Sequence, residues 1–133
     1  MNLKISVIIP FFYPNKKFIG AEEYFSLLAF EKCLSAIFKS EYKNYEVIAV
    51  SDGSSKESIE IAQKYPCKII KLIKNSGSGY SRNKGAYFAK GKILVFLDSD
   101  VEVKADALRI INERYNSNSK NVALQGVFSH TPN

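Results

Sequence analysis

Two carboxylates separated by one small residue, Asp98 and Asp100, are the residues of this sequence best suited to chemistry. They directly follow a short apolar run, residues 93–97, which is typical of a strand buried on both faces of a sheet. Alternate side chains of an ideal strand share a face, so both carboxylates would reach one site. Because a buried carboxylate without a partner is costly, we expect a divalent cation, Mg²⁺ or Mn²⁺, and hence phosphate chemistry. The alternative is a turn in which one aspartate caps the following helix.

A second candidate segment is Asp52-Gly53, which follows the apolar run of residues 45–50. An acid followed by glycine at the end of a strand is most often a turn. The functional interpretation is that the Asp52 carboxylate accepts hydrogen bonds from a base or a sugar. The two residues alone leave both interpretations open.

The third candidate segment is residues 75–85, in which Gly77 and Gly79 let the backbone approach a ligand closely. Arg82 lies early in the helix that we expect next, where a cation is disfavoured by the helix dipole and a bound anion would offset that cost. The spacing fits neither a dinucleotide-binding fingerprint nor a P-loop. A flexible loop with a solvated arginine is the alternative.

Strand and helix patterns alternate along the chain and must position these residues. Apolar runs predict strands at 5–9 (stopped by Pro10), 45–50, 67–73, 93–97 and 122–128. Apolar stripes and capping residues predict helices at about 22–39, 56–64, 80–89 (stopped by Gly91) and 105–115, with Ser55 as an N-cap. Such an alternation predicts an α/β fold, a mostly parallel sheet in a Rossmann-like three-layer α/β/α sandwich. Ligands of these sheets bind outside the carboxyl ends of the strands, where Pro10, Asp52, Asn75 and Asp98–Asp100 all fall.

The composition sets the class of protein. A length of 133 residues suits one domain, and we expect residues 1–133 to form it. The net charge of +6 favours polyanionic partners without choosing among nucleotides, nucleic acid and an anionic membrane. Cys33 and Cys67 have no metal or redox spacing and suggest free thiols in a reducing cytoplasm. The apolar stretch 5–13 is shorter than the about 20 residues of a membrane helix and lacks the features of a signal peptide.

Four motifs, in order along the chain, resemble the N-terminal half of family 2 glycosyltransferases, which have the GT-A fold. They are Ser-Val-Ile-Ile-Pro at 6–10, Tyr-Glu-Val-Ile-Ala-Val-Ser-Asp-Gly-Ser-Ser at 45–55, Ser-Arg-Asn-Lys-Gly at 81–85, and the approach to Asp-x-Asp at 89–100. The resemblance implies a domain that binds a nucleoside diphosphate sugar, with a UDP-sugar favoured, for inverting transfer of a hexose-like sugar in polysaccharide biosynthesis.

The resemblance also implies roles for matching positions. Asp52, with Gly53, would contact the base, and Pro10 and Phe11 would border its pocket. Arg82 would lie near the nucleotide and its phosphates. Asp98 would reach the ribose or the metal, and Asp100 would bind the Mg²⁺ or Mn²⁺ that bridges the diphosphate. A cation there would stabilise the departing nucleoside diphosphate.

The sequence departs from the family pattern in three places. Ser51 replaces the first acid of the usual Asp-Asp-Gly-Ser turn, Ser81 replaces an alanine, and the segment between Tyr13 and Ala29 is longer than usual. No residue matches the catalytic base of the family, so we expect the base and the acceptor half beyond residue 133. Whether the chain is a piece of a longer enzyme or a naturally short relative stays open. Any association with the inner face of a membrane is expected from regions outside this chain.

Two other functions compete with a sugar transferase that is weakly active or inactive by itself. The first is a non-catalytic nucleotide-binding module, or a degenerate remnant without a base. The second is nucleotidyl transfer, which expects a glycine-rich loop where this chain has Pro-Phe-Phe-Tyr-Pro at 10–14. No motif supports nucleic-acid binding.

Overall fold

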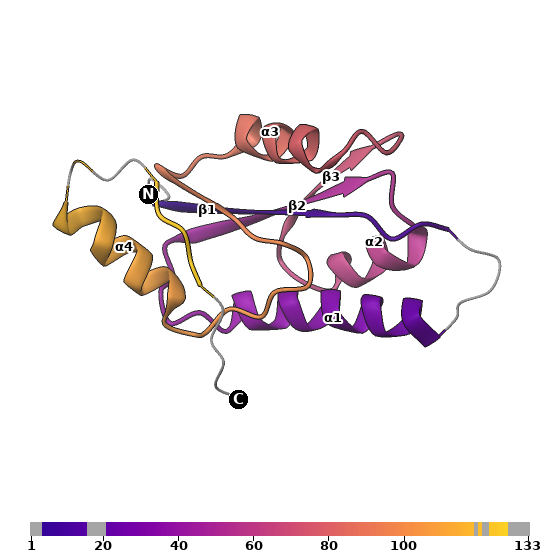
Figure 1. Cartoon of the computed structure of the whole chain (residues 1–133), viewed down its shortest axis with the longest axis horizontal. Coiled ribbons are helices and arrows are strands. Elements are labelled where there is room, and N and C mark those ends of the chain that lie inside the picture. The colour runs from indigo at the N-terminus through magenta and orange to yellow at the C-terminus, as the bar shows by residue number, and fades with distance from the viewer. Residues whose placement is uncertain (1–3, 16–20, 119, 121–122, 128–133) are drawn as a thin grey trace.

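The computed structural model describes residues 4–15, 21–118, 120 and 123–127, in which strands and helices alternate (Figure 1). The strands are β1 (Ile5–Phe11), β2 (Tyr45–Asp52), β3 (Lys68–Leu72) and β4 (Ile93–Phe96). The helices are α1 (Ala21–Phe38), α2 (Lys56–Gln63), α3 (Ser78–Phe88) and α4 (Ala107–Ser117). All strand pairs are parallel. The predicted α/β fold is therefore confirmed.

The strand order is β3-β2-β1-β4, so the chain changes direction across the sheet at β1. Helices α1 and α2 cover one face of the sheet and α3 covers the other (Figure 1). The loop after β1 leads to α1 on one face of the sheet. The chain that enters β4 comes from α3 on the opposite face. The carboxyl ends of β1 and β4 therefore form a topological switch point, where open α/β sheets bind ligands.

The core explains why β1 is apolar throughout. Ile5, Val7 and Ile9 are fully buried in the cluster that lies against α1, and Ile8 is fully buried on the opposite face. A central parallel strand has both faces covered, so it shows a continuous apolar run instead of alternation. Gly85 lets α3 approach this strand, because a Cβ atom at that position would lie 2.4 Å from Cγ2 of Ile8.

Pro10 does not end β1, contrary to the prediction. The strand continues to Phe11, and Pro10 is in register with Val50 of β2. The backbone groups of Lys4, just before β1, and of Ile8 within it face β4, since their carbonyl oxygens accept the N–H groups of Ile93 and Leu97. Position 10 faces the same way, but β4 has already ended at Phe96. The missing N–H of proline therefore costs no ladder hydrogen bond.

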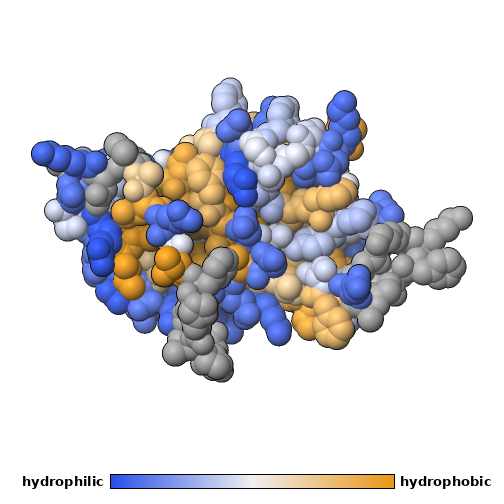
Figure 2. Space-filling model, viewed as in Figure 1, coloured by the Kyte–Doolittle hydropathy of each residue, from blue (hydrophilic) through white to orange (hydrophobic). Residues whose placement is uncertain are grey.

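The prediction that the strand before Asp98 is buried on both faces is also wrong. In β4 the side chains of Leu94 and Phe96 are 41% and 50% exposed, because α3 covers β1 and β2 and leaves this end of the sheet open. Leu124 and Val127 are exposed as well, and apolar surface gathers between α4 and the sheet on the face shown in Figure 2. In the described part of the chain β4 is an edge strand with one packed face.

The ends of most elements differ from the predicted bounds by one or two residues. Helix α3 begins at Ser78, earlier than expected, and ends at Phe88 with the extended residue Ala89 as C-cap, so Gly91 is not its stop. Gly91 is needed for a different reason: a Cβ atom there would lie 2.6 Å from the backbone of Ile5 and Ser6. The expected last strand at 122–128 is absent from its described residues, 123–127, because no neighbouring strand pairs with them. Residues 122 and 128 lie outside the described part.

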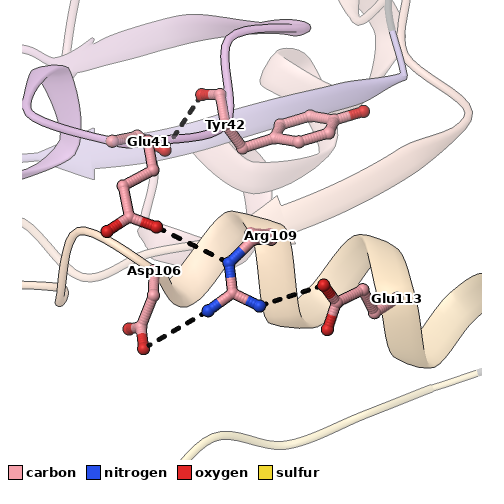
Figure 3. Close-up of polar contacts among 6 residues, drawn as sticks. Glu41, Tyr42, Asp106, Arg109 and Glu113 are labelled. Carbon is pink, nitrogen blue, oxygen red and sulfur yellow. Dashed lines mark hydrogen bonds and ion pairs between the residues drawn. The ribbon is translucent and has the colours of Figure 1, made fainter.

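An ion pair and a backbone hydrogen bond connect α4 and the residues just before it to the turn after α1. The guanidinium of Arg109 lies among three carboxylates, at 2.9 Å from Glu113, 3.5 Å from Glu41 and 3.8 Å from Asp106 (Figure 3). The backbone N–H of Glu41 also donates to the carbonyl of Ala105 at 2.9 Å. These contacts fix the segment that follows the two aspartates. Among the described residues, no helix combines the length and apolar character that crossing a membrane requires.

Candidate functional site

A pocket of about 490 Å³ lies at the carboxyl ends of the strands. Five segments that are distant in sequence line it: the end of β1 with the loop after it, Ser26 of α1, the end of β2, residues 75–82 at the start of α3, and the turn after β4. Six sequence-predicted residues are among its lining side chains, namely Pro10, Phe11, Asp52, Arg82, Asp98 and Asp100. The predicted convergence at one edge of the sheet is confirmed.

The two aspartates reach the pocket from a turn. Strand β4 ends at Phe96, and the N–H of Val101 donates to the carbonyl of Asp98 at 3.2 Å, which closes the turn. Both carboxylates line the pocket and are exposed. The N-cap position of α4 is Asp106, whose side chain makes no capping hydrogen bond, so the alternative in which Asp98 or Asp100 caps this helix is excluded.

Arg82 reaches across the pocket to this turn. Its Nη2 atom lies 3.0 Å from Oδ1 of Asp98, and its Nη1 atom lies 3.4 Å from the hydroxyl of Ser78 one helical turn earlier. The side chains of Arg82 and Asp98 are 38% and 63% exposed, so water still reaches the pair. The arginine therefore holds its guanidinium beside the aspartates while remaining open to an anionic ligand.

Asp52 organises the loop before α3. Its carboxylate is almost completely buried, and its oxygens accept the backbone N–H groups of Ser76 at 2.7 Å and Gly77 at 3.0 Å. Gly53 has a positive φ of 71°, and a Cβ atom there would lie 2.7 Å from the backbone nitrogen of Asn75. These two residues therefore join the end of β2 to the wall of the pocket formed by residues 75–77.

Tyr13 connects three sides of the pocket. Its hydroxyl lies 2.8 Å from the hydroxyl of Ser99, the residue between the two aspartates. Its backbone N–H donates to Oγ of Ser54 at 2.8 Å, and its carbonyl accepts the N–H of Ser55 at 2.7 Å. The ring packs on Phe30 of α1, and this burial raises the pKa of the Tyr13 hydroxyl. The neutral phenol thus fixes the turn that carries the carboxylates.

Cys33 lies under the same turn from the side of α1. Its thiol is buried and donates to the carbonyl of Asp98, with a sulfur–oxygen distance of 3.5 Å. Burial raises the pKa of the Cys33 thiol to about 12. The thiol is therefore protonated and inert at neutral pH, as expected of a structural cysteine.

The oxygens that could hold a cation are those of Asp98 and Asp100. Oδ1 of Asp98 forms an ion pair with Arg82. Among the described residues, none donates a hydrogen bond to the Asp100 carboxylate or forms an ion pair with it. The described residues contain no group of three or more His, Cys, Asp or Glu side chains that could surround a metal. Two carboxylates nevertheless suit Mg²⁺ or Mn²⁺, which commonly take one or two protein carboxylates and complete their shell with water and substrate phosphates.

A sequence profile described as Glycosyl transferase family 2 matches residues 24–133, which is most of the chain. The chain belongs to glycosyl transferase family 2. Among curated relatives, the glycosyltransferase GlyG of Streptococcus pneumoniae serotype 4 is 24% identical over 135 residues, a match that covers 98% of this chain and 41% of GlyG. The cholesterol galactosyltransferase of Borreliella burgdorferi is 30% identical over 123 residues, covering 90% of this chain and 31% of that protein.

Two solved structures have a similar fold, and one of them contains a bound nucleotide sugar. TarS of S. aureus (residues 1–349) has a TM-score of 0.74 and 23% identity, with 96% of this chain and 39% of TarS covered. A mannosyltransferase of Pyrobaculum calidifontis, in complex with GDP-Man and Mn²⁺, has a TM-score of 0.62 and 20% identity, with 81% of this chain and 31% of that chain covered. These similarities confirm the GT-A fold. The family 2 chain thus spans less than half the length of these relatives.

Two of the residues that the resemblance places around the base also make contacts within the fold. Phe11 is 2% exposed, and its ring stacks on Phe30 with centroids 4.6 Å apart, so most of its side chain belongs to the core. Gly53 is outside the pocket lining and abuts the backbone of Lys74 and Asn75. Their contact with a nucleotide stays a prediction.

Sequence reasoning missed several polar and aromatic residues of the site. Tyr13 and Phe12 line the pocket from the loop after β1, and Phe12 is 44% exposed there. Their position just after the first strand was an available signal, since that edge of the sheet was already identified. Ser99 looked like a spacer between two acids, and no local pattern in the sequence indicates its partner Tyr13, which lies 86 residues away.

Proposed function

We propose that this family 2 chain is the donor-binding part of a glycosyltransferase and binds a nucleoside diphosphate sugar in the pocket. The observation that carries the proposal is the meeting of Asp98, Asp100 and Arg82 at the switch point between β1 and β4. UDP is our first candidate for the nucleotide. The solved relative that holds GDP-Man and Mn²⁺ supports a nucleotide sugar as ligand of this fold.

The charges of the pocket support a requirement for a divalent cation. Asp52, Asp98 and Asp100 contribute three carboxylates and Arg82 one guanidinium, so the lining side chains alone repel a diphosphate. Asp98 and Asp100 would hold Mg²⁺ or Mn²⁺, which when bound supplies positive charge against the pyrophosphate of the leaving group. Arg82 adds a charge-assisted donor for phosphate oxygens.

The other lining residues position these charges. Asp52 holds the segment 75–77 through two backbone N–H groups, and Tyr13 holds the turn of the aspartates through Ser99. Phe12 offers an exposed aromatic ring to a base at the mouth of the pocket. The acceptor hydroxyl needs a base to take its proton, and none of the residues above is assigned that role.

Calorimetric titration with UDP, with and without Mn²⁺, tests this proposal. We expect the chain to bind UDP when Mn²⁺ is present and to bind it only weakly after the ion is chelated. The affinity of Asp100→Ala should be lower by about tenfold or more. Glu57→Gln on α2 is the control, because Glu57 is acidic but does not line the pocket. Equal affinity of the wild-type chain and Asp100→Ala would remove Asp100 from the metal site. No binding of UDP, GDP or their sugars would overturn the proposal.

A further inference from the structure

The positive charge of the chain is concentrated in one stretch. Residues 61–97 contain eight of the 19 lysines and arginines, whereas all 13 acidic residues lie elsewhere. This stretch comprises β3, α3 and β4 with their connections. The net charge of +6 is therefore a property of one part of the fold.

Much of this charge lies around α3, which covers the face of the sheet opposite α1 and α2 (Figure 1). The inner side of α3 is marked by Ser81 and Gly85, which are buried. Tyr80, Lys84 and Tyr87 follow at helical spacing on the outer side, and Tyr80 and Tyr87 are 50% and 81% exposed. A helix with two tyrosines turned to solvent presents more aromatic surface than a purely solvated face requires.

Lysines interleave with these aromatic rings. Nζ of Lys68 lies 4.7 Å from the ring centroid of Phe88, and Nζ of Lys84 lies 5.8 Å from that of Tyr80. Lys90 and Lys92 follow in the exposed connection to β4. We name Lys68, Tyr80, Lys84, Tyr87, Lys90 and Lys92 the α3 face.

The ammonium groups of the α3 face have no acidic partner among the residues that the structure describes. Among these residues, four acids contact the stretch, and none of them pairs with an ammonium group of the α3 face. Glu31 pairs with Lys64 and Asp98 pairs with Arg82. Oε1 of Glu46 accepts the backbone N–H of Lys90 and the hydroxyl of Ser6, and Asp52 accepts backbone N–H groups. In the described part of the chain, no ion pair involves Lys68, Lys84, Lys90 or Lys92. Their charge is therefore available to an external anion.

We propose that the α3 face docks on an anionic lipid bilayer. Exposed tyrosines beside lysines are the composition that lies at a membrane interface, where the rings enter the headgroup region and the cations meet anionic lipid. Lysine on an edge strand discourages strand pairing, which accounts for Lys68 but not for the lysines of α3 and its connection. The residues of the α3 face do not line the pocket, so docking leaves the pocket open.

A lipid surface fits this face better than a nucleic acid does. Single strands are bound in a charged groove that follows the phosphate backbone, with aromatic side chains on which the bases stack. The α3 face is instead the convex outer side of one helix, flanked by lysines from its neighbours. A flat layer of anionic headgroups matches that shape. Docking is independent of the proposed function, because it uses none of the residues assigned to nucleotide binding.

Vesicle cosedimentation tests the proposal with the chain itself and vesicles of equimolar phosphatidylglycerol and phosphatidylcholine. We expect binding that disappears on pure phosphatidylcholine and weakens as salt shortens the screening length.

The variant Lys68→Gln/Lys84→Gln/Lys90→Gln should lose about fivefold in vesicle affinity for each lysine replaced. The control Lys32→Gln/Lys39→Gln/Lys104→Gln removes the same charge from exposed lysines of α1, of the turn after it and of the segment before α4, and should bind as the unmodified chain. Tyr87→Ser should weaken binding, whereas Tyr24→Ser on α1, where Tyr24 is 61% exposed, should not.

The same variants give the outcomes that overturn the proposal. No binding to anionic vesicles, or equal losses in both triple variants, would show that the α3 face has no special role. Binding to a single-stranded oligonucleotide that the α3-face variant alone loses, with vesicle binding unchanged, would assign the face to nucleic acid instead. Circular dichroism and UDP titration of each variant check that the fold and the pocket are intact.

Discussion

Nη2 of Arg82 and Oδ1 of Asp98 are 3.0 Å apart, and this ion pair joins α3 to the turn after β4 across the mouth of the pocket. Neither residue belongs to the core, and both remain partly exposed. Pairs of this kind contribute little to folding. The ion pair should therefore affect ligand binding more than it affects the stability of the folded chain.

Arg82→Gln is expected to separate these two effects. The free energy of unfolding should change by less than about 1 kcal/mol, because the pair is hydrated. The affinity for UDP with Mn²⁺ should fall by about tenfold, since a charge-assisted donor to phosphate is lost. Calorimetric titration and urea denaturation measure the two quantities. Lys64→Gln, which breaks the exposed Lys64–Glu31 pair outside the pocket lining, should leave UDP affinity unchanged. Equal losses in both variants would contradict a specific role for Arg82.

Asp52→Asn should loosen the wall of the pocket. The amide nitrogen of asparagine cannot accept, so the N–H of Ser76 or Gly77 loses its acceptor. We expect a loss of about 1–3 kcal/mol in unfolding free energy. Hydrogen exchange at the amides of Ser76 and Gly77 should accelerate more than exchange in β1. Uniform acceleration throughout the sheet would indicate global destabilisation without a local role for Asp52.

Tyr13→Phe removes only the hydroxyl that contacts Ser99 and keeps the ring on Phe30. We expect a severalfold loss of Mn²⁺-dependent UDP affinity, because the turn with both carboxylates becomes less ordered. Tyr45→Phe is the matched control, since its hydroxyl donates to the carbonyl of Ile37, away from the pocket. Each variant loses one hydrogen bond, about 1 kcal/mol of stability. Unchanged UDP affinity in Tyr13→Phe would refute the positioning role.

Gly85→Ala and Gly79→Ala add the same methyl group at two positions of α3. At Gly85 the new Cβ would lie 2.4 Å from Cγ2 of Ile8, whereas at Gly79 it meets nothing within 4 Å. Overpacking should cost Gly85→Ala about 1–3 kcal/mol, and Gly79→Ala should be neutral or stabilising by up to about 1 kcal/mol. Thermal and urea denaturation compare the two. Similar stabilities would show that α3 shifts away from β1 at little cost.

The buried thiol of Cys33 predicts a loss of stability at alkaline pH. Burial raises its pKa from 9.0 to about 12 in the folded chain, so the folded state holds this proton more tightly than the unfolded state. Its contribution is complete below pH 9.0 and is lost as the pH rises toward 12, at up to about 1.4 kcal/mol per pH unit. Urea denaturation across this range should show a shallower decline in Cys33→Ala. Identical slopes in both proteins would contradict the assignment.

The elements of this fold were predictable because their patterns are local. Burial was indicated directly by the apolar runs around Ile8 and Ile48 and by the apolar stripe of α1. The side chain of the N-cap residue Ser55 accepts the N–H of Ser58, as expected. The exposure of Leu94 and Phe96 was not predictable, since it depends on which face of β4 another element covers. A single apolar run does not distinguish a strand packed on one face from one packed on both.

The site was predictable to the extent that it follows from topology. The alternation of strands and helices brings Asp52, Arg82 and Asp98 to one edge, and the sequence contains that alternation. The partners within the site depend on long-range geometry. The contacts of Asp52 with residues 76 and 77 and of Tyr13 with Ser99 join segments that no local pattern relates.

The open flank of β4 has a practical consequence for any work with these 133 residues alone. The strand pairs with β1 along one edge, and its other edge has no neighbouring strand among the described residues. The apolar side chains of Leu94 and Phe96 in this strand are exposed to solvent. Such an edge is a template for pairing with a second molecule. We expect concentrated samples to self-associate through it, so affinities are best measured in dilute solution with the particle size monitored by light scattering.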